Sequence, residues 1–236
     1  MRSVRMLVSC LTGFFVLVAS GIVHAGSPLK DPGIPDREMI TYSCRTGDST
    51  ISVVEEIAIK REGDKQFYEI TSSSKLLDRK IKLLRETMAI VSIHTVRKFQ
   101  AATLDTVLTV IDEKPTFENG AMKLADFSIL TYLLRGFPFG TLENLKVGYY
   151  GEQKKNSYSM SVNYKGRERI TVKGGTFDCY KLEFGMDGFI GAFFPKMDAW
   201  YSVEAPHYLV YYEGPDGPPG TPKRIMEMVQ YTKPSP

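Results

Sequence analysis

Histidine, cysteine and tryptophan are scarce in this 236-residue chain, which holds three histidines, three cysteines and one tryptophan. His94 and His207 have no partner at metal-ligand spacing, and no Cys-x-x-Cys pair occurs, so the spacings typical of zinc sites are missing. No local motif pairs a nucleophile with a histidine. We therefore predict no metal, no cofactor and no enzymatic activity. A hydrolase that uses His207 or a cysteine is the least favoured alternative.

Apart from one segment at its start, the chain lacks an apolar run long enough to span a bilayer. That segment, residues 6–23, follows two arginines, and its last residue begins the Val-His-Ala sequence of residues 23–25, which is the layout of a secretory signal peptide. We predict a signal peptide over residues 1–25, cleaved after Ala25, and a periplasmic location. A membrane anchor formed by the uncleaved segment is the alternative.

The chain also lacks a cluster of basic residues. Without Arg2 and Arg5, the 30 basic residues fall to 28, against 27 acidic ones. This balance predicts no nucleic-acid partner. Export would permit a disulfide between Cys44 and Cys179. The alternation around the two cysteines argues against one, because it places the thiols on differently composed faces.

Alternation of apolar and polar residues dominates the rest of the chain. Such segments, separated by Gly, Asp and Pro, predict an antiparallel sheet built from hairpins. Residues 26–36 contain three prolines and two glycines and predict a flexible tether. We predict a single β-rich domain over residues 37–233. The clearest alternating segments are "ISVVEEIAIK", "LDTVLTVID", "SYSMSVNY", "RERITV" and "RIMEMVQY".

One segment, "ADFSILTYLLRGFPFG", breaks the alternation and predicts a short helix over residues 127–135. Asp126 is a candidate N-cap, Gly136 a candidate left-handed C-terminal cap, and Pro138 cannot continue the helix. This helix is apolar nearly all round and must be buried. The predicted fold class is mainly β: a curved antiparallel sheet or half-open barrel wrapped around one short apolar helix.

The stretch "DAWYSVEAPHYLVYYE", residues 198–213, contains the one tryptophan and four tyrosines. Its strand "YLVYY" is apolar on both faces, unlike a strand of an antiparallel sheet with one wet face. One face can pack on the helix, and the other needs cover or lines a pocket. An apolar pocket with a few hydroxyl groups suits an acyl chain, whereas simple core packing is the alternative for each residue.

The order of "LTYLLRGFPFG", "GRERITVKGGTFDCYKLEF" and "DAWYSVEAPHYLVYYEG" resembles the bacterial envelope proteins of domain of unknown function 3108. The resemblance covers roughly residues 38–231. Those proteins look similar in fold to the periplasmic lipoprotein-localisation carriers, half-open antiparallel barrels whose concave face, closed by helices, holds acyl chains. The resemblance implies a lipid-handling role in the envelope by analogy of fold.

We therefore expect an exported cell-envelope protein that binds an apolar ligand, such as a lipid or a lipoprotein acyl chain, between the sheet and the helix. The alternative is a ligand-free envelope interaction or assembly protein, which would dock a partner through a sheet edge or through residues 189–195. The side chains expected to line the ligand site are Phe127, Leu130, Tyr132 and Leu134 on the helix, and Trp200, Tyr208, Val210 and Tyr212 opposite it.

Overall fold

The computed structural model describes residues 27–99, 103–109, 117–118, 121–124, 127–150, 157–191, 193–215 and 222–233. The predicted signal peptide and the candidate N-cap Asp126 lie outside these residues. Within the described ranges, no helix has both the length and the apolar character needed to cross a bilayer.

The described residues contain fourteen strands that form one sheet, in the order β6-β5-β4-β3-β2-β1-β14-β13-β12-β11-β10-β9-β8-β7. Neighbouring strands are antiparallel except β8 and β9, which are parallel. The strands are β1 Glu38–Thr46, β2 Ser49–Glu62, β3 Lys65–Ser74, β4 Leu77–Leu84, β5 Ala89–Lys98, β6 Thr103–Thr109, β7 Phe117–Glu118, β8 Ala121–Leu124, β9 Asn144–Tyr150, β10 Ser157–Val172, β11 Gly175–Met186, β12 Met197–Ser202, β13 Leu209–Pro215 and β14 Lys223–Thr232.

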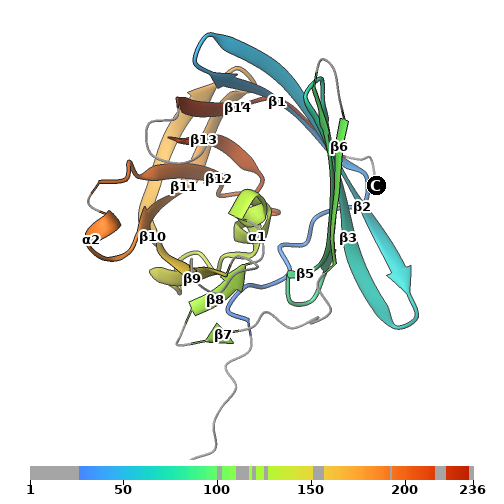
Figure 1. Ribbon diagram of the computed structural model, residues 1–236, viewed down its shortest axis with the longest axis horizontal. Coiled ribbons are helices and arrows are strands. Elements are labelled where there is room, and N and C mark those ends of the chain that lie inside the picture. The colour runs from blue at the N-terminus through green and yellow to red at the C-terminus, as the bar shows by residue number, and fades with distance from the viewer. Residues whose placement is uncertain are drawn as a thin grey trace, which may run out of the picture.

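The first and last strands, β1 and β14, pair at the centre of the sheet. From there β1 to β6 form one wing, and β14 back to β7 form the other. The described residues show no pairing between the two edge strands, β6 and β7. Figure 1 shows the two wings curling towards each other around a central space. The predicted half-open barrel is therefore confirmed.

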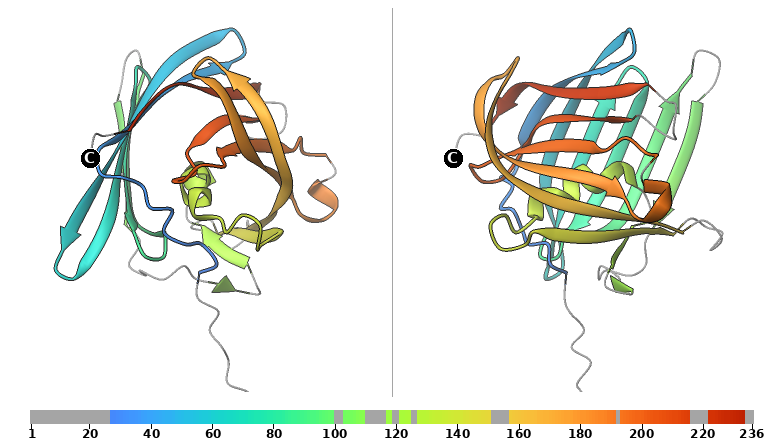
Figure 2. Two further views of the ribbon diagram at one scale, coloured as in Figure 1. Left: turned by 180° about the vertical axis from the view of Figure 1, so that it is seen from behind. Right: turned by 90° about the vertical axis from the view of Figure 1, so that its left-hand side faces the viewer.

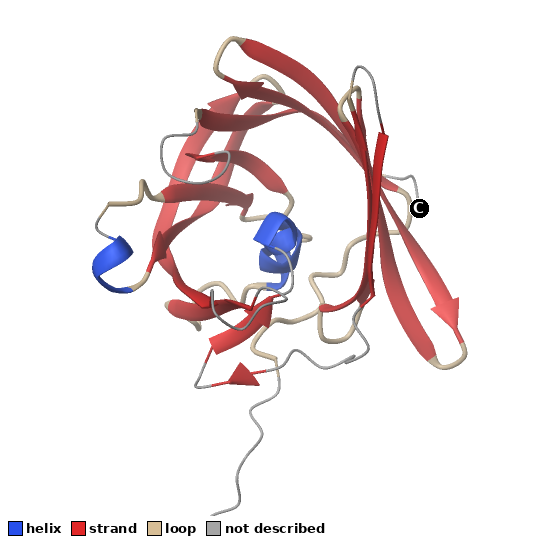
Figure 3. Cartoon of the chain, in the orientation of Figure 1, coloured by secondary structure: helices blue, strands red, loops and turns tan. Residues whose placement is uncertain are grey.

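A helical segment fills the middle of this curve. Parallel strands need a crossover connection, and the one between β8 and β9 is formed by η1 Phe127–Ile129, α1 Leu130–Leu133 and η2 Leu134–Gly136. The segment lies inside the sheet (Figure 3), and the backbone oxygen of Thr131 accepts a hydrogen bond from the Tyr201 hydroxyl at 2.9 Å. Its burial agrees with the prediction from its apolar sequence. A second helix, α2 Gly188–Gly191, lies outside the curve.

Residues 27–36, predicted to be a flexible tether, pack against the domain instead. Leu29 and Ile34 are buried in the main core cluster. The Tyr68 hydroxyl donates to the Asp31 carboxylate and accepts the Ile34 N–H at 3.1 Å. Figure 2 shows the segment, in blue, crossing one end of the half-barrel. Leu29 and Ile34, which lie between the prolines, anchor the segment to the domain. The composition of the segment does not reveal this anchoring.

Gly136 has a different role from the predicted left-handed cap, since its φ is not positive. A Cβ at this position would lie 2.3 Å from the backbone oxygen of Lys30, whose N–H donates to the Gly136 oxygen at 2.9 Å. The glycine therefore allows the N-terminal segment to approach the end of the helix.

Replacing Gly136 by alanine should lower the free energy of unfolding by about 1–3 kcal/mol, because the methyl group meets backbone rather than a movable side chain. Urea denaturation would measure the change. Gly185→Ala is the matched control, since a Cβ there has no atom within 4 Å, and it should leave stability nearly unchanged. Equal behaviour of the two variants would contradict the close approach.

Candidate functional site

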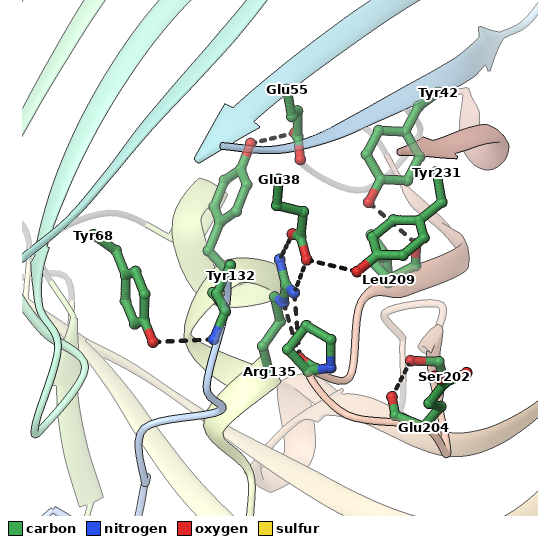
Figure 4. Close-up of polar contacts among 12 residues, drawn as sticks. Glu38, Tyr42, Glu55, Tyr68, Tyr132, Arg135, Ser202, Glu204, Leu209 and Tyr231 are labelled. Atoms are coloured by element: carbon green, nitrogen blue, oxygen red, sulfur yellow. Dashed lines mark hydrogen bonds and ion pairs between the residues drawn. The ribbon is translucent and has the colours of Figure 1, made fainter. Parts of the chain in front are cut away.

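Charged side chains are buried where the helical segment meets β1 and β2 (Figure 4). Glu38 on β1, Glu55 on β2 and Arg135 on η2 are 0%, 5% and 3% exposed. Burying an ionised group is costly unless another charge or hydrogen bonds compensate it. These three residues, with Tyr42, Tyr132 and Tyr231, are called the buried polar cluster below.

Arg135 and Glu38 form a bidentate ion pair. Nη1 donates to Oε1 at 2.6 Å, and Nη2 donates to Oε2 at 3.0 Å. Arg135 also donates to the backbone oxygen of Pro206 at 3.3 Å, and the Tyr231 hydroxyl donates to Glu38 at 3.1 Å. Burial alone would lower the pKa of Arg135, but Glu38 outweighs it and the pKa is raised above its usual value. The ion pair thus ties the helical segment to the centre of the sheet.

Glu55 makes the second contact between the sheet and the helical segment. The Tyr132 hydroxyl donates to Glu55 Oε1 at 2.5 Å. Burial raises the pKa of Glu55 to about 7, and the Tyr132 hydrogen bond and the Arg135 charge only partly oppose this rise. Burial and the Glu55 charge raise the pKa of Tyr132, which therefore stays a hydroxyl donor. Glu55 is the group of this cluster whose charge changes near neutral pH.

A small cavity lies within the cluster. Its volume is about 10 Å³, which is about the space needed for one water molecule. An acyl chain does not fit this cavity while the helical segment is in place. The lining residues are Tyr42, Glu55, Thr131, Tyr132, Arg135, Leu209 and Met226.

Around the cluster, the concave face of both wings is apolar. On the N-terminal wing, isoleucines of four neighbouring strands pair directly with one another and form a row across the sheet. On the other wing, valine, leucine and phenylalanine side chains occupy the equivalent face. The buried members are Ile57, Ile70, Ile81 and Ile93 on the first wing, and Leu145, Val147, Val162, Leu182 and Phe184 on the second. The buried polar cluster is therefore surrounded by the apolar residues of both wings.

The structure brings only some of the expected lining residues to the helix–sheet contact. Leu130 and Leu134 are buried in the core, and Tyr132 joins the buried polar cluster. The side chain of Phe127 lies outside the described part of the chain. On the opposite side, Tyr208 stacks on Tyr231 with ring centroids 4.2 Å apart.

Two other expected lining residues belong to β13. Val210 is fully buried, and half-buried Tyr212 pairs with Met226 of β14. Met226 lines the small cavity. Both residues therefore belong to the packed wall of the half-barrel.

Trp200 is not brought to the helix. Its Nε1 donates to Glu168 at 2.6 Å, and the Lys181 ammonium lies 4.6 Å from its ring centroid. The neighbouring Tyr201 is the residue that bonds the helical segment. Successive strand residues point to opposite faces, so one of these two aromatics had to face outwards. The sequence did not show which one.

Glu38, Glu55 and Arg135 were not predicted from the sequence as site residues. Each is a lone charge in an apolar pattern: Glu38 precedes Ile40 and Tyr42 on one face, and Arg135 ends an apolar helix. Glu55 lies between Val53 and Ile57 on a buried face, while the adjacent Glu56 is exposed. A charged residue at a position that the apolar pattern assigns to the buried face was the feature that could have revealed each of them.

The residues considered for catalysis or metal binding are dispersed. Cys44 and Cys179 are buried and are not joined by a disulfide, and burial raises the pKa of the Cys179 thiol to about 12. His207 Nδ1 lies 2.9 Å from the Ser202 backbone oxygen, and burial lowers its pKa. In the ranges that the structure covers, no group of three or more His, Cys, Asp or Glu residues could hold a metal ion.

No family model matches the chain, and no curated protein matches it. The resemblance to domain of unknown function 3108 therefore stays a prediction. Several solved structures are similar over most of the chain. One is a β-barrel-like protein of domain of unknown function DUF1849 from Brucella abortus, 8% identical, with a TM-score of 0.43, covering 84% of this chain and 98% of that one.

A second is a candidate exported protein with a YmcC-like fold from Bacteroides fragilis, 10% identical, with a TM-score of 0.34, covering 85% of this chain and 97% of that one. A third is a candidate lipoprotein from Parabacteroides distasonis, 11% identical, with a TM-score of 0.36, covering 88% and 99%. At these TM-scores the likeness assigns neither a family nor a function to this chain.

Proposed function

We propose that this chain is an exported cell-envelope protein that binds an apolar ligand, such as a lipid or a lipoprotein acyl chain, on the concave face of its half-barrel. The ligand would take the place of the helical segment, residues 127–136. The observation that carries the proposal is the apolar wall on the concave face of both wings. The short crossover segment is part of what covers this wall. The cellular location rests on the predicted signal peptide.

Exchange of the helical segment for a ligand is physically reasonable. Exposing a buried isoleucine costs about 1.5–3 kcal/mol, so the row of isoleucines needs a cover at all times. Leu130 and Leu134 belong to the same buried core cluster as these isoleucines, and an acyl chain in place of the segment would keep the wall covered. The segment is only ten residues long, and no side-chain hydrogen bond caps the N-terminus of α1 at Ile129. Its polar anchors are few, chiefly the contacts of Arg135 and Tyr132.

Loosening one anchor should raise the affinity for an apolar ligand. Tyr132→Phe removes the hydrogen bond to Glu55 and should destabilise the closed state by about 1 kcal/mol. If opening limits binding, the apparent affinity for a dansylated undecanoic acid should rise about fivefold. A fluorescence titration would measure this.

Tyr211→Phe is the matched control, because the Tyr211 hydroxyl bonds Glu213 at 3.2 Å, away from the cluster. Its affinity should equal that of the wild type. The proposal fails if neither wild type nor Tyr132→Phe takes up the probe and native mass spectrometry of protein from its own host shows only the unliganded mass.

A ligand-free interaction or assembly role is the second candidate. The observation in its favour is the cavity of about 10 Å³, which leaves no room for an acyl chain in the closed form. A clean unliganded mass, together with a specific protein partner captured by cross-linking in cells, would support it over the first.

A further inference from the structure

Three apolar side chains protrude at one end of the N-terminal wing. Leu76 lies in the turn between β3 and β4, Phe99 directly follows β5, and Leu104 lies on β6. They are 50%, 59% and 50% exposed. Moving large apolar side chains that are this exposed from water into an apolar phase lowers the free energy.

These residues lie on neighbouring strands although they are separated in sequence. The backbone N–H of Lys98 donates to the Leu76 oxygen at 2.8 Å, so the end of β5 lies beside the β3–β4 turn. Leu104 pairs directly with Arg97 on β5. Together with Lys75, these residues form one rim, defined here as Lys75, Leu76, Arg97, Phe99 and Leu104.

The rim carries a surplus of positive charge. The exposed side chains of Lys75 and Arg97 have no ion pair with the described residues. Of the nearby acids, Asp78 forms an ion pair with Lys98 at 2.6 Å. Asp105 is hydrogen-bonded to His94 at 2.7 Å and lies on the opposite face of β6 from Leu104. Lys75 and Arg97 therefore add two cations, unpaired among the described residues, beside the protruding apolar side chains, while the Asp105 carboxylate lies on the other face of β6.

The rim also borders the concave face. Three residue pairs lie on the same face of β5 and β6. They are Ile93 with Leu108, Thr95 with Thr106, and Arg97 with Leu104. Ile93 and Thr95 are buried on the inside of the curve. Side chains two apart on a strand share a face, so Arg97 and Leu104 continue the concave face towards one end of β5 and of β6, the edge strand of this wing (Figure 1).

We infer that this rim docks the protein on a lipid surface with anionic headgroups. Leu76, Phe99 and Leu104 enter the interface, while Lys75 and Arg97 contact headgroup phosphates. Interfacial binding combines buried apolar area with attraction of cations to anionic lipid, and the rim offers both within one short edge. The inference stands apart from the proposed ligand site, because docking needs no space inside the half-barrel.

Flotation with vesicles tests the inference, using the chain as purified from its own host. Wild type should float with vesicles of phosphatidylethanolamine and phosphatidylglycerol at low salt, and far less with pure phosphatidylcholine. Lys75→Gln with Arg97→Gln should lower the partition coefficient about 25-fold, from about fivefold for each cation. Added salt should weaken wild type in the same way.

Leu76→Ser with Phe99→Ser should lower partitioning at least about tenfold at every salt concentration. Two variants serve as controls. The double variant Lys60→Gln with Arg61→Gln removes two exposed cations at the other end of the wing. The single variant Phe193→Ser removes an exposed aromatic side chain of another loop. Both should float like wild type.

The inference is overturned if wild type does not float with anionic vesicles, if it floats equally with phosphatidylcholine, or if the rim variants behave like their controls. A protein that floats through the rim but takes up no dansylated fatty acid would support the docking inference and contradict the proposed ligand.

Discussion

Replacing Arg135 by methionine should lower the free energy of unfolding by about 3–5 kcal/mol, because it leaves Glu38 buried without its cation. Glu38 has no exposed area, and its two oxygens accept both guanidinium hydrogen bonds. The remaining donor, the Tyr231 hydroxyl, cannot balance a full charge. The loss would be measured by urea denaturation at neutral pH.

The matched control is Arg169→Met. Arg169 forms an ion pair with Asp178 at 3.2 Å, but its side chain is 72% exposed. Pairs of this kind contribute about 0–1 kcal/mol, so this variant should keep nearly the stability of the wild type. Combining Arg135→Met with Glu38→Gln should recover much of the loss, since no buried charge is then left alone. A loss below 1 kcal/mol for Arg135→Met would mean that Glu38 is not buried as described.

The sheet was predictable because local alternation records which face of each strand is buried. In β2, for example, Val53 and Ile57 are buried while Ser52 and Glu56 are exposed. The pairing of the first strand with the last was not predictable in this way. The β1–β14 contact joins residues such as Ile40 and Tyr231, and no local pattern encodes so distant a partner.

The helical segment shows the same division between local and tertiary information. Burial of Leu130 and Leu134 follows from their spacing in an apolar run. Its geometry does not, because the segment is a single α-helical turn between two 3₁₀ turns, shaped by its contacts with Lys30 and Tyr201. Propensity is a weak guide where packing decides the conformation.

The charged part of the site could be suspected but not assembled from the sequence. Glu55 is a carboxylate between buried positions of one strand, a signal that was not used to predict the site. Its partner Tyr132 comes from a different element, 77 residues away. Glu38 and Arg135 are 97 residues apart. Only the crossover between β8 and β9 brings these side chains together, and that topology is a property of the whole sheet.

Glu55→Gln should remove a large pH dependence of stability. The pKa of Glu55 is raised from 4.5 to about 7 in the folded protein, chiefly by burial. The folded state therefore holds the proton more tightly than the unfolded state. The stabilisation is complete below pH 4.5 and is lost as the pH rises to about 7. The loss is about 3 kcal/mol, from about 1.4 kcal/mol per pKa unit.

Glutamine resembles the protonated carboxyl, and its amide oxygen can still accept the Tyr132 hydrogen bond. Glu55→Gln should therefore match wild type near pH 4.5 and exceed its free energy of unfolding by about 2–3 kcal/mol at pH 8. Other carboxylates titrate alike in both proteins, so the difference between the two urea series isolates Glu55. Glu56→Gln, next in sequence but exposed, should follow wild type at every pH. If the free energy of unfolding of Glu55→Gln and of wild type changes with pH in parallel, Glu55 does not ionise in a buried site. The polar contacts that hold the helical segment would then be independent of pH near neutrality.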